Sequence, residues 1–244
     1  MKRTYSDLHL CPSTKDPKQT TTLINKAYKL GYHQIAITLP PNCTGQEIQQ
    51  TRNTCNEVNL DMATRVDLKP NNPNELLHTL RKLRREFEII SVICDSKNVS
   101  RQAAKDRRVD LLNFPSIDFR RRFFDLAEAE LASNSLAALE IDTKPLLTLE
   151  GPARIRLLSS LRRETTIAKD FHIPIIISSG TPNELLMRKP MGQAALASLF
   201  DLDKETALNA VSKNPIALVK RNREKLSPNF VAPGIRIIRR GKDC

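Results

Sequence analysis

The stretch of sequence that decides the fold is GYHQIAITLPP, residues 31–41. Its centre, Ile35 to Thr38, is a short apolar run between turn-forming residues, which is typical of a strand buried on both faces. Gly31 ends the helix before this strand, and Pro40 and Pro41 stop the strand itself. The stretch is therefore one step of a helix–strand repeat, and similar steps lie on both sides of it.

Seven such runs are predicted to be strands, and predicted helices separate them. The strands are expected at residues 4–10, 35–38, 62–68, 89–94, 109–114, 137–142 and 173–177. The helices are expected at residues 16–30, 46–58, 73–87, 99–107, 118–134 and 152–171. A spacing of about 20–40 residues between strands is that of βα units. Because every strand is predicted to be buried, the pattern favours a parallel sheet closed into an α/β barrel over an antiparallel sheet.

The rest of the chain is predicted to complete one domain. Residues 190–226 should be helical and cover one end or side of the barrel. No linker rich in Gly, Ser or Pro divides the sequence, so residues 1–228 are assigned to a single barrel domain with additional C-terminal helices. Residues 229–244 form a short basic tail, in which 235–240 is expected to be a strand or an arm.

Positive charge is the strongest compositional signal. The 244 residues include 39 Lys and Arg against 27 Asp and Glu, for a formal net charge of +12. This balance suggests a polyanionic partner, although a generically basic protein without one is the alternative. An anionic membrane fits less well, because no basic amphipathic helix stands out and no apolar stretch approaches the roughly 18 residues of a membrane span.

Cysteine and glycine usage excludes several classes of protein. The five cysteines are odd in number, widely spaced and without a CxxC pair, so a zinc ribbon or a disulfide framework is disfavoured. No signal peptide is visible at the N-terminus, and a cytoplasmic protein with reduced thiols is expected. The 7 glycines form neither a GxGxxG nor a Walker loop, which argues against ordinary nucleotide binding.

The C-terminal ends of the strands would form the functional face of such a barrel. A hydrolytic metal centre there needs at least three converging ligands, and the candidates are His9, Cys11, Asp95 and Asp142. Only one of the four histidines, His9, lies near this face. The sequence therefore predicts neither a metal site nor catalytic residues in this chain.

A set of charged side chains is expected inside the barrel. Strand alternation places them on barrel-facing positions: Asp7, His9, Arg65, Asp67, Glu140 and Asp142. Buried carboxylates must be paired or protonated, and Arg65 is the obvious counter-charge. Two interpretations stay open: an acid/base site with tuned pKa values, or a structural ion network that plugs the lumen. The structural network is favoured, because no nucleophile or metal accompanies these groups.

Several stretches, in order, carry a resemblance to a known family. They are YSDLHL, GYHQIAIT, DRRVDLLNFP, ALEIDTKPLL, IPIIISSG, and MRKPMGQAALASLF through AVSKNP. From Thr4 to about Lys220 the chain resembles the protein component 3 family of ribonuclease P. That family is similar to the polymerase-and-histidinol-phosphatase (PHP) superfamily of metal-dependent phosphoesterases, which implies a distorted seven-stranded, TIM-like barrel.

The chain departs from that superfamily at its metal ligands. Where the first motif pairs two histidines around one residue, this sequence has His9 and Cys11. Leu39 and Pro40 stand where the second motif has Asp-His, and residues 178–180 are Ser-Ser-Gly where another Asp and His are expected. A barrel without these ligands is consistent with an RNA-binding scaffold. A freestanding metal-dependent phosphoesterase of the PHP superfamily is the alternative.

The resemblance also implies partners. The chain would be a non-catalytic subunit of ribonuclease P, the ribonucleoprotein endonuclease that removes the 5′ leader from precursor tRNA. Its expected partners are the ribonuclease P RNA, a small subunit called protein component 2 and, through the complex, precursor tRNA. No cofactor is expected in the chain, and Mg²⁺ is expected on the catalytic RNA.

Basic residues then become the candidate RNA contacts. The densest cluster is predicted to be opposed by Asp106 alone and consists of Arg101, Lys105, Arg107 and Arg108. A second candidate set near the strand-end face is Lys144, Arg188 and Lys189, and the tail adds Arg236, Arg239 and Arg240. With 5% aromatic residues and no Trp, base stacking should be minor, and recognition of structured RNA through its backbone is favoured.

Overall fold

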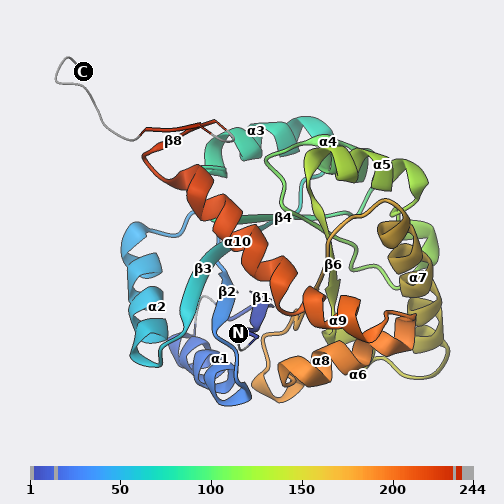
Figure 1. Cartoon of the computed structure of the whole chain (residues 1–244), viewed down its shortest axis with the longest axis horizontal. Coiled ribbons are helices and arrows are strands. Elements are labelled where there is room, and N and C mark those ends of the chain that lie inside the picture. Colours follow the sequence, from blue (N-terminus) through green and yellow to red (C-terminus); the bar gives the residue numbers. More distant parts are fainter. Residues whose placement is uncertain (1–2, 14–15, 233–234, 238–244) are drawn as a thin grey trace.

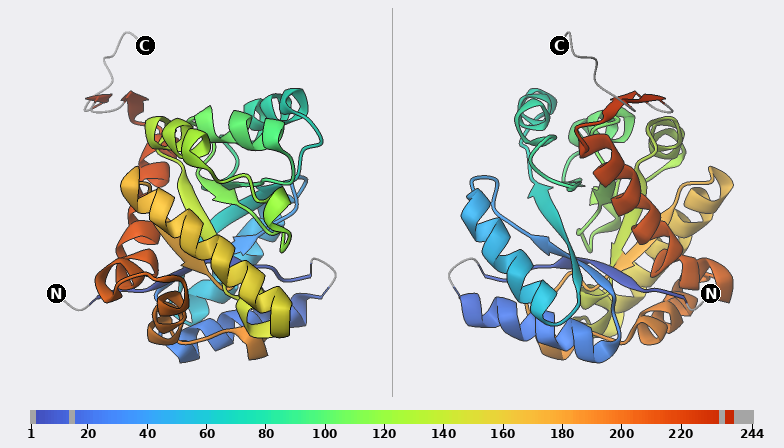
Figure 2. Two further views of the ribbon diagram at one scale, coloured as in Figure 1. Left: turned by 90° about the vertical axis from the view of Figure 1, so that its right-hand side faces the viewer. Right: turned by 60° about the vertical axis from the view of Figure 1, so that its left-hand side comes forward.

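The computed structural model describes residues 3–13, 16–232 and 235–237. Within them, seven parallel strands lie side by side in chain order and curve into a nearly closed barrel (Figures 1 and 2). They are β1 (Ser6–Leu10), β2 (Gln34–Thr38), β3 (Asp61–Leu68), β4 (Ile89–Ile93), β5 (Leu111–Asn113), β6 (Ala138–Asp142) and β7 (Ile175–Ser178). The predicted seven-stranded parallel barrel is confirmed.

The first and last strands meet just beyond β7. The backbone N–H of Gly180 donates to the carbonyl of His9 at 2.9 Å, and that of Cys11 donates to Thr181 at 3.2 Å. Gly180 has a positive φ of 60°, a conformation that favours glycine. This seam brings the start of the chain beside a segment some 170 residues later, which places β1 side chains next to those that follow β7.

Helices surround the strands as an outer layer (Figure 2). They are α1 (Pro17–Leu30), α2 (Gly45–Glu57), α3 (Pro73–Leu83), α4 (Lys97–Lys105), α5 (Leu126–Ser135), α6 (Lys144–Thr148) and α7 (Gly151–Asp170). Local chemistry sets several boundaries. Asp16 caps α1, which ends at Gly31 with φ 89°, and Thr44 and Glu47 form a capping box at the start of α2.

One predicted helix is wrong in extent. Residues 118–134 were expected to form a single helix, but the structure has a 3₁₀ turn at Phe119–Arg121 and begins α5 only at Leu126. The reason is the side chain of Arg122, which is buried and donates to the carbonyls of Phe114 and Ser116 and to the carboxylate of Glu164. These contacts hold the intervening residues outside helical geometry.

The C-terminal helices pack against the strands and the other helices, and the last of them covers the end of the barrel at which the strands begin. They are α8 (Pro190–Leu196), α9 (Lys204–Ala210) and α10 (Lys213–Leu226), and α10 crosses this end in Figure 1. Leu218 and Val219 of α10 pack against the first apolar layer inside the barrel. Asn222 donates to the carbonyl of Glu88, the residue before β4.

After α10 the described chain forms a small antiparallel pair, β8 (Phe230–Ala232) and β9 (Ile235–Arg236). Arg239 and Arg240 lie outside the described residues, as does the side chain of Arg236. Among the helices described, none is long and apolar enough to cross a membrane.

Candidate functional site

Arg65 is the centre of a polar layer inside the barrel. The first apolar layer includes Ala63, so two residues further along β3 the side chain of Arg65 also enters the lumen, where it is completely buried. Its Nη1 and Nη2 donate to the two carboxylate oxygens of Glu140 at 2.5 and 2.6 Å. Its Nε donates to Asp67 at 2.7 Å, and Nη1 also donates to the carbonyl of Leu8. Arg65 therefore ties β1, β3 and β6 together.

His9 extends this arrangement toward the strand ends. Its Nδ1 lies 2.7 Å from Asp142 Oδ1, and its Nε2 lies 3.0 Å from Asp67 Oδ2. Asn113 donates to both Glu140 and Asp142, so the acidic groups are also linked across β5. We call the connected set of His9, Arg65, Asp67, Glu140 and Asp142 the lumen network.

Charge pairing decides the protonation of the lumen network. Burial and Arg65 both lower the pKa of His9, but the carboxylates of Asp142, Asp67 and Glu140 outweigh them and raise it well above its usual value. Burial raises the pKa of Asp142, yet His9 and Arg65 lower it further, and the same cations hold the pKa of Asp67 far below its usual range. Both ring nitrogens of His9 lie within hydrogen-bond distance of carboxylate oxygens, which cannot donate, so the geometry also favours a proton on each nitrogen.

Asp7 was predicted to belong to this network, and the structure corrects that expectation. Its carboxylate accepts hydrogen bonds from the hydroxyl and the backbone N–H of Ser179, which follows β7, and lies 3.5 Å from the side-chain nitrogen of Gln193 on α8. The register of β1 against β2 shifts between Asp7 and Leu10. Strict alternation fails across this irregularity. The Asp7 carboxylate accepts from the backbone N–H of His9 at 3.2 Å, but it does not face the ring of His9 or the guanidinium of Arg65 as a member of the network would.

Three members of the lumen network, His9, Glu140 and Asp142, offer ligand atoms that lie within 4.8 Å of one another. These residues nevertheless do not fit a metal ion. Both ring nitrogens of His9 already face carboxylates, and a protonated imidazole has no lone pair to offer. Glu140 is bound by both Nη atoms of Arg65. A metal ion would have to displace one buried cation and deprotonate another.

The strand-end residues compared above with phosphoesterase ligands have structural contacts here. The hydroxyl of Ser178 donates to Glu140 at 2.9 Å, and Ser179 holds Asp7 as described above. The backbone N–H of Leu39 continues the pairing of β2 with β3 by donating to the carbonyl of Arg65 at 2.8 Å. Ser178 and Leu39 thus link neighbouring strands of the sheet, and Ser179 joins β1 to the segment after β7.

The structure divides the densest predicted basic cluster. Arg101 on α4 forms ion pairs of 2.6 Å with Asp125 and Glu128, and Arg108 pairs with Asp106 at 2.6 Å. The expectation that Asp106 alone opposes the cluster is therefore wrong, because α5 packs against α4 and supplies two further carboxylates. Lys105 and Arg107 are exposed.

The second candidate set does not form one surface either. Lys144 begins α6 directly after β6, on the strand-end face. The carbonyl of Arg188 instead accepts a hydrogen bond from Tyr32, which precedes β2, and the guanidinium of Arg188 donates to carbonyls of its own loop. The neighbouring Lys189 is exposed. The chain around Arg188 and Lys189 thus packs beside Tyr32, a residue that precedes a strand.

Fold and site together define a class of protein: a parallel α/β barrel whose lumen is closed by an internally paired ion network and whose surface is strongly basic. The chain belongs to the RNase P subunit p30 family, whose sequence model matches residues 4–227. It is a protein subunit of ribonuclease P.

The similar proteins agree over nearly the whole chain. Ribonuclease P protein component 3 of Methanosarcina barkeri is 31% identical over 215 residues, which cover 88% of this chain and 87% of that protein. The component of the same name from Methanococcoides burtonii is 26% identical over 238 residues, 97% of this chain and 95% of that protein. The predicted family is confirmed, and a subunit is favoured over a freestanding phosphoesterase.

A solved structure shows the same fold. A chain in the cryo-EM structure of archaeal ribonuclease P with mature tRNA superposes with a TM-score of 0.84 at 22% sequence identity. The match covers 96% of this chain and 99% of that chain. The distorted seven-stranded barrel and its C-terminal helices are thus an established architecture.

Proposed function

We propose that this chain is a non-catalytic scaffold of ribonuclease P, which binds and supports the catalytic RNA during removal of the 5′ leader from precursor tRNA. The observation that carries the proposal is the pairing inside the lumen. His9, Glu140 and Asp142 come closest to a set of metal ligands, but each already has a partner. Both ring nitrogens of His9 contact carboxylates, those of Asp142 and Asp67, and Glu140 is bound by Arg65. A site in this state has no free base and no open ligand position.

The proposal includes the partners of the chain. The ribonuclease P RNA supplies the cleavage chemistry and binds the Mg²⁺ that it requires, and protein component 2 is the small subunit that acts together with this chain. The net charge of +12 supports contact with the phosphate backbone, because cationic side chains that neutralise phosphates release counterions. The chain itself needs no cofactor for this role, and the cytoplasm is the proposed location.

The purified chain alone should hydrolyse no phosphodiester and hold no stoichiometric transition metal. The reason is that a ligating His9 would have to give up its proton and its contacts with Asp67 and Asp142. Metal analysis after purification without chelators, followed by assays with added Mn²⁺ or Zn²⁺, measures both properties. One tightly bound Zn²⁺ or Mn²⁺ per chain, with hydrolysis that chelators abolish, would contradict the proposal.

A further inference from the structure

Four cationic side chains from three segments of the chain gather around one buried carboxylate at the end of the barrel where the strands begin. The carboxylate is that of Asp110, in the loop that leads into β5, and its residue is completely buried. Arg84 at the end of α3 reaches it with Nη1 at 2.6 Å, and Arg221 of α10 reaches it with Nη2 at 3.2 Å. Lys225, one helical turn after Arg221 on α10, and Arg107, in the turn shortly before Asp110, complete the group, which we call the Asp110 cluster.

The Asp110 cluster is held in place by its inner members. One oxygen of Asp110 accepts both from Arg84 and from the backbone N–H of Ile90. The guanidinium of Arg221 also donates to the carbonyl of Leu136 at 3.0 Å. Two of the four cations are therefore fixed by hydrogen bonds to the barrel and to the loop before β6.

Positive charge in the cluster is not balanced by the protein. Asp110 is one carboxylate against four cations, and neighbouring carboxylates are already paired, Asp106 with Arg108 and Glu88 with Arg223. Among the described residues, neither Arg107 nor Lys225 takes part in a side-chain hydrogen bond or an ion pair within 4 Å. Burial, together with the charges of Arg221, Arg84 and Arg107, lowers the pKa of Lys225.

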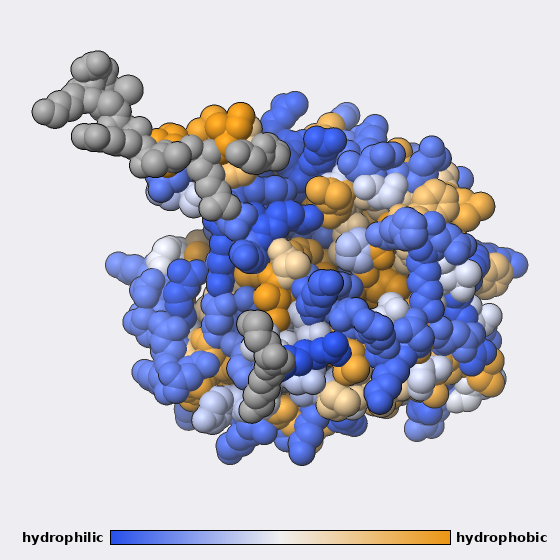
Figure 3. Space-filling model, in the orientation of Figure 1, coloured by the Kyte–Doolittle hydropathy of each residue, from blue (hydrophilic) through white to orange (hydrophobic). Residues whose placement is uncertain are grey.

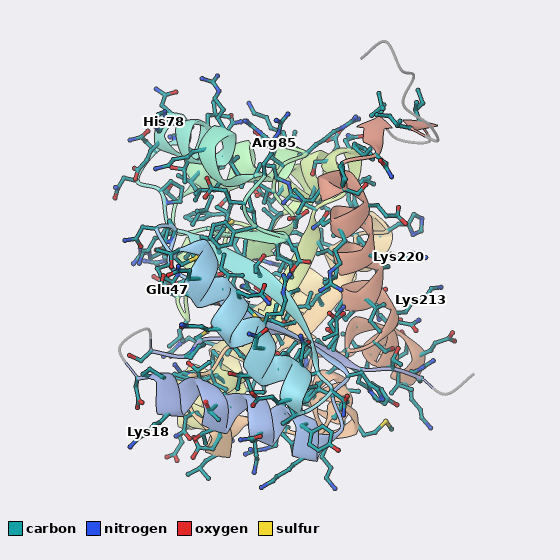
Figure 4. All side chains as sticks on the ribbon, turned by 90° about the vertical axis from the view of Figure 1, so that its left-hand side faces the viewer. Lys18, Glu47, His78, Arg85, Lys213 and Lys220 are labelled. Carbon is teal, nitrogen blue, oxygen red and sulfur yellow. The ribbon has the colours of Figure 1, made fainter. Side chains whose placement is uncertain are left out.

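The surroundings of the cluster favour a nucleic acid backbone. Hydrophilic side chains cover much of the surface around the C-terminal half of α10 (Figure 3). Lys213 and Lys220 project outward from the same helix and extend the basic surface along it (Figure 4). Arg and Lys side chains are the usual contacts to backbone phosphates, and a surplus of positive charge without matching carboxylates is complementary to a phosphate chain.

We propose that Arg84, Arg107, Arg221 and Lys225 bind backbone phosphates of the ribonuclease P RNA at the end of the barrel where the strands begin. This inference rests on the proposed function and adds a location to it. Arg84 and Arg221 are positioned by Asp110, and Arg107 and Lys225 supply charges that have no partner within the described chain. A phosphate would neutralise the excess charge without disturbing the interior.

The test uses the double variant Arg107→Ala/Lys225→Ala. Neither side chain forms an ion pair with a described carboxylate, so the barrel should fold without them. The matched control is Lys18→Ala/Lys29→Ala, which removes the same charge from exposed positions on α1. Each chain is assembled with ribonuclease P RNA and the partner subunit, and the RNA affinity is measured over a series of salt concentrations. Equal melting temperatures of the free chains establish that folding is unchanged.

The cluster variant should flatten the log–log salt dependence by about two units and weaken RNA binding roughly 30-fold near physiological salt. The control should change neither quantity. The proposal is overturned if the two double variants behave alike. It is also overturned if the cluster variant weakens binding to the partner subunit without RNA while its salt dependence with RNA is unchanged. A wild-type chain that never binds the RNA would overturn the proposed function itself.

Discussion

Replacing Arg65 with Met should lower the free energy of unfolding by about 3–5 kcal/mol. Arg65 is completely buried and donates to Glu140, Asp67 and the carbonyl of Leu8. Its removal leaves buried carboxylates without their counter-charge, and that uncompensated charge, more than the lost packing, destabilises the fold. Urea unfolding followed by circular dichroism measures the change.

The control for this variant is Lys69→Met. It also replaces a cationic side chain with Met, at the position that directly follows β3. Lys69 is exposed and pairs with Asp95 at the surface, so its loss should change stability by less than about 1 kcal/mol. Adding Glu140→Gln to Arg65→Met should recover part of the lost stability, because one unpaired charge is removed. An Arg65→Met chain as stable as the control would show that the lumen network does not hold the barrel together.

Replacing Gly180 with Ala should destabilise the chain by about 2–4 kcal/mol. Gly180 lies at the seam between β1 and β7 with φ 60°, and an added Cβ would lie 2.6 Å from the Cβ of Asp142. Asp142 would have to move away from His9, which it contacts at 2.7 Å. The cost therefore combines a left-handed backbone with overpacking against the lumen network.

Gly31→Ala separates these two contributions. Gly31 also has a positive φ, of 89°, but an added Cβ would meet nothing within 4 Å. Its substitution should cost only about 1 kcal/mol, the conformational part. If the two variants had equal free energies of unfolding, the close packing of the seam would not matter to stability.

The barrel could be predicted from the sequence because each strand is a local signal. A continuous apolar run such as Ile35–Thr38, bounded by Gly31 and by prolines, needs no knowledge of its neighbours. The extent of α5 could not be predicted in this way. Asp118 and Asp125 are both credible caps, and the choice depends on Arg122 reaching Glu164, a contact between distant parts of the chain.

The same distinction between local and distant contacts explains which site residues could be predicted correctly and which could not. Alternation along β3 and β6 placed Arg65 and Glu140 on one face, where the structure has them paired. It failed at Asp7, because the irregular register of β1 is set by pairing with β2. Of the Asp110 cluster, Arg107 was predicted as an RNA contact, but Arg84, Arg221 and Lys225 were not. These cations come from α3 and α10, and only their proximity in the fold reveals that they belong together.

We propose that the chain acts in ribonuclease P as a scaffold and that its lumen network is structural. The most direct test is precursor-tRNA cleavage by the complex assembled from RNA and protein subunits, with wild-type chain, with His9→Gln and without the chain. We predict that omission of the chain lowers the cleavage rate, that His9→Gln keeps it nearly unchanged, and that the chain without RNA cleaves nothing. Loss of cleavage in a fully assembled, well-folded His9→Gln complex would contradict the claim.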